Sequence, residues 1–343
     1  MAINQLRKDP ISGRWTIVLK DEFQLEKLII NTKTKFEEPK VGVCPFCETK
    51  EHLTPPEIMA LRREGYPQNG QGWRVRVIPD KNPVLQIYGD INNRGVGLYD
   101  VLDGIGAHEI VIETPRHDES LADLAPEQIS EVLWTYKERI LDLKEDERLR
   151  YIMVHKNSGE AVGETAEHSY SFIIGSPVTP KRVKDELVNS REYFQYKERC
   201  VFCDVIRQEK LMEERIVVDD GNYLAFTPFA SRRPFEVWIA PQRHQTFFEQ
   251  EADIHGLAVI LKSVLGRLFK LLNKPAYTMV VHSGPNIKAG RKRGFWTTLE
   301  KDYHWHIEIT PRLRSYTSFE VSAGFPVNSV IPFRAAELLR GVE

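Results

Sequence analysis

The sequence predicts an α+β fold built as a tandem duplication, with one copy in residues 1–190 and the other in residues 191–343. Two observations predict this organisation. The pattern Cys-x-Phe-Cys occurs twice, beginning at Cys44 and at Cys200. Each occurrence is followed by the same order of strand and helix patterns, and such an ordered repeat indicates a duplicated structural unit.

The first repeated element is a strand that runs toward an Arg-His pair. Residues 108–117 read HEIVIETPRH, and residues 235–244 read FEVWIAPQRH. Apolar residues with a period of two, several of them β-branched, predict a strand in both copies.

The second repeated element is a long amphipathic helix. Apolar residues recur at three- and four-residue spacings from Ile129 to Leu143, and again from Ile254 to Leu268. This spacing places them on one side of a helix, so each helix is expected to have one buried face. Pro126 lies near the start of the first helix, where proline is tolerated.

Each copy continues with a strand and a glycine-containing turn. The strands open with Tyr151-Ile-Met-Val154 and Tyr277-Thr-Met-Val280, which we align with each other. The turns cover residues 157–163 and 283–290, and their backbone N–H groups are candidates for contact with a phosphate. A last strand begins with a histidine in each copy, as HSYSFII and HWHIEIT.

Each copy therefore supplies two cysteines and two histidines, which form a closed tetrahedral set for structural zinc. A redox-active cysteine pair and histidines bonded only to backbone are the alternatives. The predicted sites are Cys44, Cys47, His117 and His168 in the first copy, and Cys200, Cys203, His244 and His304 in the second.

The residue two positions after the last histidine of each set is also a candidate. Alternate residues on a strand point to one face, so this residue lies beside the metal ligand. It is Tyr170 in the first copy and His306 in the second. A histidine there is a candidate nucleophile or phosphate ligand. A tyrosine with a pKa near 10 is a poor nucleophile at neutral pH unless a cation lowers that pKa.

The composition excludes several classes of protein. Lysine and arginine number 47 against 49 aspartates and glutamates, a balance that argues against a dedicated nucleic-acid binder. We find no run of 18 apolar residues and no signal-peptide pattern, so no membrane partner is expected. The predicted location is the cytoplasm.

Several stretches carry a resemblance to a known family. They include CPFC, WRVRVIPDKNPVL, GAHEIVIETPRHDESLADL, NSGEAVGETAEHSYS, CVFC and YHWHIEITPRL. The chain resembles galactose-1-phosphate uridylyltransferase and its histidine-triad relatives over nearly its full length. The resemblance implies two histidine-triad-like halves, each an antiparallel sheet with packed helices. It also implies a homodimer with shared active sites that acts on a nucleotide sugar or sugar phosphate.

The family's catalytic strand reads His-x-His-x-Gln, and this chain departs from it. In the family the second histidine attacks the α-phosphorus of UDP-glucose, and galactose 1-phosphate then takes the UMP from the uridylyl-histidine. The glutamine binds a phosphate oxygen. Carried over, the metal-ligating histidine is His168, the nucleophile's position holds Tyr170 and the glutamine's position holds Phe172. These two replacements put ordinary uridylyl transfer in doubt.

The resemblance also implies substrate-binding positions and a possible second kind of metal site. In some relatives, residues matching Glu186, His282 and His306 bind a further divalent ion together with the position of His304. His304 cannot serve that ion and the cysteine site together, and we favour the cysteine site. The implied substrate-binding positions are Arg14, Asp80, Asn157, Gly163, Thr165, Phe172 and Glu320.

Three interpretations of function remain open from sequence. The first is a divergent nucleotidyltransferase that uses His306, uses Tyr170 or reacts without a covalent step. The second is a non-catalytic, zinc-stabilised nucleotide-sugar binder or regulatory homologue. The third is an enzyme with altered chemistry in the remodelled first-half pocket.

Overall fold

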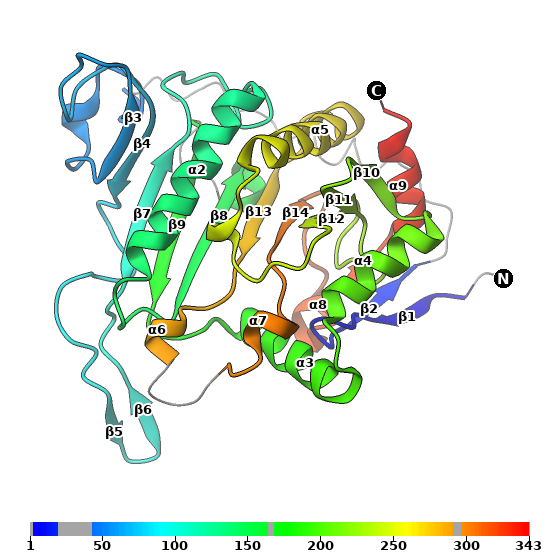
Figure 1. Cartoon of the computed structure of the whole chain (residues 1–343). Helices are drawn as coiled ribbons and strands as arrows, with labels where there is room; N and C mark the ends of the chain where they lie inside the picture. Colours follow the sequence, from blue (N-terminus) through cyan, green and yellow to red (C-terminus); the bar gives the residue numbers. More distant parts are fainter. Residues whose placement is uncertain (1–2, 20–42, 164–167, 291–295, 343) are drawn as a thin grey trace.

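Ten strands of the described chain form one continuous antiparallel sheet in a computed structural model (Figure 1). The structure describes residues 3–19, 43–163, 168–290 and 296–342. Across the sheet the order is β10 (Ile216–Asp219), β11 (Tyr223–Phe226), β12 (Val237–Pro241), β14 (His306–Pro311), β13 (Tyr277–His282), β8 (Tyr151–Ser158), β9 (Tyr170–Ser176), β7 (Ala107–Ile112), β4 (Trp73–Pro79) and β3 (Met59–Arg62).

This strand order confirms the duplication. Read from the centre outward, β8, β9, β7, β4 and β3 form the first half, and β13, β14, β12, β11 and β10 repeat that arrangement in the second. The halves join where β8 pairs with β13, with His155 opposite Val280. The predicted boundary at residue 190 falls inside helix α3 (Lys181–Lys197), so the division into two domains stays a prediction.

The two predicted helices are confirmed and lie side by side on one face of the sheet (Figure 1). They are α2 (Pro126–Leu143) and α5 (Ile254–Leu272), and Pro126 opens α2 as expected. Leu133 of α2 and Leu261 of α5 are buried in one core with strand residues such as Val154. Burial of a leucine or valine side chain contributes about 1.5–3 kcal/mol, so this shared core binds the halves together.

The opposite face of the sheet differs between the halves. Over the second half it packs against α3, α4 (Val201–Met212) and α7 (Leu299–Asp302), in a core that includes Leu187, Phe202 and Tyr303. Over the first half it carries a smaller apolar cluster made mainly by Trp73, Ile78, Ile110, Ile112 and Tyr170.

Smaller elements surround the sheet. β1 (Gln5–Lys8), β2 (Trp15–Val18) and β15 (Val327–Asn328) form a three-stranded sheet, and β5 (Arg94–Val96) and β6 (Tyr99–Val101) form a projecting hairpin (Figure 1). The remaining helices of the described residues are α6 (Ile287–Gly290), α8 (Ser318–Ala323) and α9 (Pro332–Arg340), with single turns at Glu51–Leu53, Glu160–Val162 and Phe248–Gln250. Within the described ranges, no helix has the length and apolar character needed to cross a membrane.

The predicted strands are shorter than expected at the histidines. β7 ends at Ile112 and β12 ends at Pro241, so His117 and His244 lie in the loops that follow. β9 and β14 begin two residues after His168 and His304. A loop can turn its side chain toward ligands from other segments, and these histidines do so.

Our alignment of Tyr151 with Tyr277 is wrong by one residue. Tyr277 lies in the core beneath α2 and α5, whereas Tyr151 lies in the core on the opposite face. A shift of one residue moves a side chain to the other face of a strand. Ile152, which shares the core of Tyr277, is its true counterpart, and Asn157 is therefore the counterpart of His282.

Candidate metal centres and active-site face

The four predicted ligands of the first half are brought together. Cys44 and Cys47 come from the loop before β3, while His117 and His168 come from the loops that leave β7 and enter β9. Cys47 Sγ lies 3.6 Å from His117 Nδ1 and 3.8 Å from His168 Nδ1, and Cys44 Sγ lies 3.7 Å from His168 Nδ1.

The second half repeats this cluster. Cys200 caps the start of α4, Cys203 lies in its first turn, and His244 and His304 follow β12 and precede β14. Cys203 Sγ lies 3.3 Å from His244 Nδ1 and 3.7 Å from His304 Nδ1.

Both clusters fit zinc. Bonds of about 2.3 Å to sulfur and 2.0–2.1 Å to nitrogen place sulfur and nitrogen about 3.6 Å apart in a tetrahedron. The outer nitrogens of His168, His304 and His244 lie 2.7, 2.9 and 2.9 Å from the carbonyl oxygens of Thr114, Pro241 and Glu300. Such bonds orient metal-bound histidines and leave Nδ1 for the metal. A redox pair would need no such arrangement of histidines.

A third group of potential ligands lies in the second half, between β13, β14 and α3. Glu186, His282 and His306 meet as the resemblance implied, and Glu308 joins them. All four are at most 1% exposed. Sequence reasoning missed Glu308, although its position two residues after His306 on one strand placed it on the same face.

Charges inside the third group are largely paired. Arg182 and Arg232 both form ion pairs with Glu308, and His282 Nδ1 lies 3.1 Å from a Glu186 oxygen. Burial disfavours the charged ring of His282, but the carboxylates of Glu186 and Glu308 outweigh it and raise its pKa to about 9. His282 is therefore protonated at neutral pH when no ion is bound.

His306 is enclosed by aromatic rings. It stacks on Trp238 at 4.5 Å and on His282 at 4.4 Å between ring centres, and it is 0% exposed. Burial and the charge of His282 lower its pKa to about 3. Because the whole side chain is buried, a phosphate cannot reach either ring nitrogen, and the structure does not favour His306 as a nucleophile.

Tyr170 is also buried, at 3% exposed. Its ring packs 5.4 Å from Phe46 and 5.2 Å from Phe172. The tyrosine therefore fills the nucleophile's position as a packing residue.

Phe172 lies on a half-exposed face of the first half, between two histidines that sequence reasoning missed. Its ring stacks on His155 of β8 at 5.2 Å and contacts His108 of β7 at 5.3 Å. His108 Nε2 lies 3.4 Å from Asp80 Oδ2, and the Val84 N–H donates to His108 Nδ1. Both histidines occupy outward-facing positions of their strands, and that alternation was the available signal. We call this surface the active-site face.

The other implied substrate residues are divided between two places. Asn157 belongs to the active-site face, where it accepts a hydrogen bond from Thr278, and Gly163 ends the turn after β8 with φ of +84°. Arg14 and Glu320 lie beside the second half, near β2 and on α8 (Figure 1). Thr165 lies outside the described residues.

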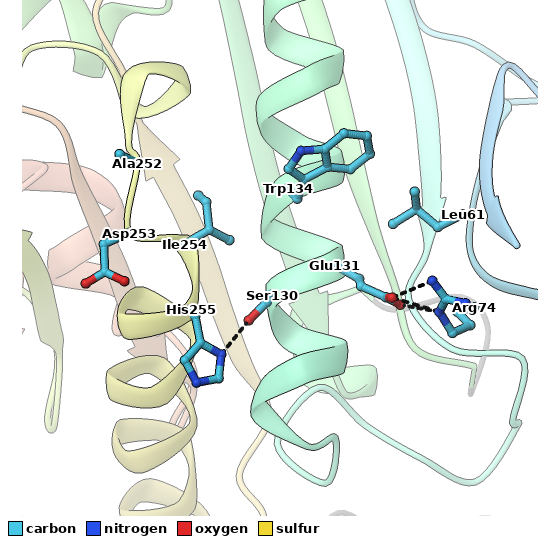
Figure 2. Close-up of a pocket in the computed structure, with 9 residues that line it drawn as sticks. All are labelled: Leu61, Arg74, Ser130, Glu131, Trp134, Ala252, Asp253, Ile254 and His255. Atoms are coloured by element: carbon cyan, nitrogen blue, oxygen red, sulfur yellow. Dashed lines mark hydrogen bonds and ion pairs between the residues drawn. The ribbon is translucent and has the colours of Figure 1, made fainter.

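A shallow hollow on the helix side of the molecule contains none of the implied residues. It lies between the first turns of α5 and the side of α2, where Trp134 and Ile254 line it (Figure 2). An ion pair between Arg74 and Glu131 borders it. The predicted metal ligands and the active-site face belong to other parts of the fold.

Comparisons with known proteins agree with this architecture. The family described as galactose-1-phosphate uridyl transferase matches with its N-terminal domain over residues 82–250 and its C-terminal domain over residues 186–330. The chain is 30% identical to ADP-glucose phosphorylase of Arabidopsis thaliana, over 98% of this chain and 93% of that protein. It is 26% identical to galactose-1-phosphate uridylyltransferase of Thermotoga maritima, over 99% and 98%.

Solved structures show the same relationship. A crystal structure of the Arabidopsis thaliana ADP-glucose phosphorylase with bound ADP-glucose superimposes with a TM-score of 0.81 at 28% identity, covering 99% of this chain and 100% of that one. A uridylyltransferase structure gives a TM-score of 0.73 at 27% identity, covering 99% and 98%. The duplicated sheet, the paired cysteine–histidine clusters and these full-length matches agree: the chain belongs to the galactose-1-phosphate uridylyltransferase family.

Proposed function

We propose that this protein transfers a nucleotidyl group from a nucleotide sugar to phosphate or to a sugar phosphate. We infer the substrate class from the full-length similarity to an enzyme whose crystal structure contains bound ADP-glucose. The active-site face lies where the family's catalytic strand lies, next to the cluster that holds His168. A route through residue 170 is not proposed, because Tyr170 is packed and buried.

The two cysteine–histidine clusters would each hold one zinc ion. Zinc with four protein ligands is structural, and here it would join the loop before β3, or the start of α4, to the loops around the central strands. In the first half this fixes the entry to β9 immediately before the active-site face. The expected content is two zinc ions per chain.

The third group would hold a proton rather than an ion. Nε2 of both histidines and one oxygen of Glu308 have no hydrogen-bond partner among the described residues, which favours an ion, although His282 Nε2 lies 3.7 Å from the other Glu308 oxygen. The balance of charge favours a proton. The carboxylates of Glu186, Glu236 and Glu308 already face three guanidinium groups, those of Arg14, Arg182 and Arg232. A divalent ion would add two buried charges, whereas protonated His282 adds one, and unpaired buried charge is costly.

The active enzyme would be a homodimer. Arg14 and Glu320 contact second-half residues, so one chain does not place them on its own active-site face. The β5–β6 hairpin projects from the body with Leu98 98% and Tyr99 74% exposed. An isolated two-stranded hairpin is marginally stable in water, so apolar residues at its tip need a covering surface.

The experiment that tests the function is a substrate panel. Purified zinc-loaded protein is incubated with ADP-, UDP-, GDP- and TDP-sugars, together with either inorganic phosphate or hexose 1-phosphates, and products are separated by chromatography. We expect turnover with at least one donor. Binding of a nucleotide sugar without turnover would instead support the non-catalytic interpretation, which the apolar rings of Tyr170 and Phe172 at the family's catalytic positions would explain. The absence of both binding and turnover with every donor would refute the proposal.

A further inference from the structure

The active-site face contains one histidine that the fold does not otherwise use. His155 lies on β8 directly opposite Phe172 of β9, and it is partly exposed. Its Nδ1 atom is buried and has no hydrogen-bond partner among the described residues. An unpartnered buried nitrogen is unusual in a folded protein and calls for an explanation, such as a missing ligand.

The other described histidines on this face of the first half, and on the matching face of the second half, already have partners. Both ring nitrogens of His108 have partners, Asp80 and the backbone N–H of Val84. His117 and His168 belong to the first metal cluster. The enclosed pair in the second half is His282 and His306.

We propose that His155 is the residue that accepts the nucleotidyl group in this protein. The proposal rests on the proposed function and names the nucleophile for it. The family's nucleophilic histidine would sit at residue 170, on the neighbouring strand and the same face of the sheet. An imidazole on β8 still lies near the start of β9, which the first zinc cluster would hold in place. Tyr170 fills the position of the family's nucleophile.

The step balances without an added reactant. The lone pair of a ring nitrogen of His155 forms a bond to the α-phosphorus of the nucleotide sugar. The bond from that phosphorus to the oxygen of the sugar 1-phosphate breaks, and its electron pair leaves with the oxygen. In the second step a phosphate oxygen of the acceptor attacks the phosphorus, and the P–N electron pair returns to the ring.

Two features of the surroundings suit this role. Burial and the nearby ring of His108 lower the pKa of His155 to about 4, so its ring is neutral and keeps a lone pair at neutral pH. Asn157 lies two residues further along the same face, and the Thr278 hydroxyl donates to its Oδ1 at 3.1 Å. That bond leaves the Asn157 amide N–H groups available to a ligand oxygen.

The test is to trap and locate the adduct. Zinc-loaded protein is mixed with the donor that supports turnover, without acceptor, and digested with trypsin at mildly alkaline pH, where phosphoramidates survive. The three candidate nucleophiles fall in separate peptides. His155 is the one histidine of YIMVHK, residues 151–156, whereas Tyr170 lies in residues 157–181 and His306 in residues 302–312. We expect the nucleotidyl mass on residues 151–156.

Variants separate a catalytic role from a structural one. His155→Ala should lose the adduct and at least about a hundredfold in turnover, while His255→Ala, on the outer side of α5, should keep both. Free imidazole should restore turnover to His155→Ala, because it can carry the group in solution, and a folding defect would not respond to it. An adduct on another peptide, or full turnover in His155→Ala, would overturn the assignment but leave the proposed function standing. A wild-type protein without turnover would overturn both.

Discussion

The buried ion pair beneath β9 offers the sharpest test of how the first half is held together. Lys156 and Glu113 are both 0% exposed, and the Lys156 amine donates to Glu113 Oε2 at 2.8 Å. It also donates to Ser169 Oγ and to the Tyr170 carbonyl oxygen, each at 3.0 Å. The pair therefore fixes the two residues that follow His168, a predicted metal ligand.

Replacement of Lys156 by methionine keeps the apolar stem and removes the charge. Glu113 would then be buried without a cation, and breaking a buried pair in this way costs about 3–5 kcal/mol. The double variant Lys156→Met with Glu113→Gln removes the uncompensated charge as well. It should be more stable than the single variant by about 2 kcal/mol, because the two changes share one interaction.

The assay is urea unfolding of zinc-loaded protein at pH 7, with the midpoint converted to free energy. Lys262→Met is the matched control, since that amine is partly exposed and donates to the Ala122 carbonyl oxygen. It should cost about 1 kcal/mol. A loss of stability in Lys156→Met no greater than in this control would show that the buried pair does not hold the first half together. A loss in the double variant equal to the sum of both single changes would show the same.

Three further outcomes are expected. Cys47→Ser should reduce bound zinc, measured by mass spectrometry, from two ions to one, and a third ion in the wild type would contradict our account of the third group. Leu98→Asp should give a monomer in light scattering, and an unchanged dimer would exclude the hairpin from the interface. Burial is outweighed by Arg314 and backbone N–H groups, which lower the pKa of Glu320 to about 2. The stability that ionised Glu320 contributes to the folded protein is thus present above pH 4–5 and is lost toward pH 2. Glu320→Gln should cost about 2 kcal/mol at pH 7 and less at pH 3, and an equal cost would refute this.

Local patterns predicted a large part of the fold. The helix spacing from Ile129 to Leu143 marks a face that is indeed buried, and the two Cys-x-Phe-Cys patterns located both cysteine–histidine clusters. Periodicity reports which side of an element is buried, and ligand chemistry reports which residues must meet. Both signals are present in the residues themselves.

Other features depend on how distant segments pair, and the local sequence indicates that pairing only indirectly. The match between Tyr151 and Tyr277 looked convincing, yet the register of β8 against β13 places them on opposite faces. Glu308 and His155 gained their surroundings from α3 and from β9, segments that lie elsewhere in the sequence. Single positions of this kind carry no local pattern strong enough to mark them.

Equivalent positions on the histidine strands of the two halves differ in their access to solvent. The helices that cover the sheet cause this difference, and the strands themselves do not. In the second half α3 covers the face, so His306 and Glu308 are sealed in a paired network with Glu186. In the first half the residues at those positions, Tyr170 and Phe172, lie on a face that α3 and α4 do not cover in the described structure. Of these two faces, the described residues leave only that of the first half open to a substrate. A histidine strand that keeps its sequence but lies under a helix is therefore closed to substrate, and the half that lost the histidine holds the candidate active site.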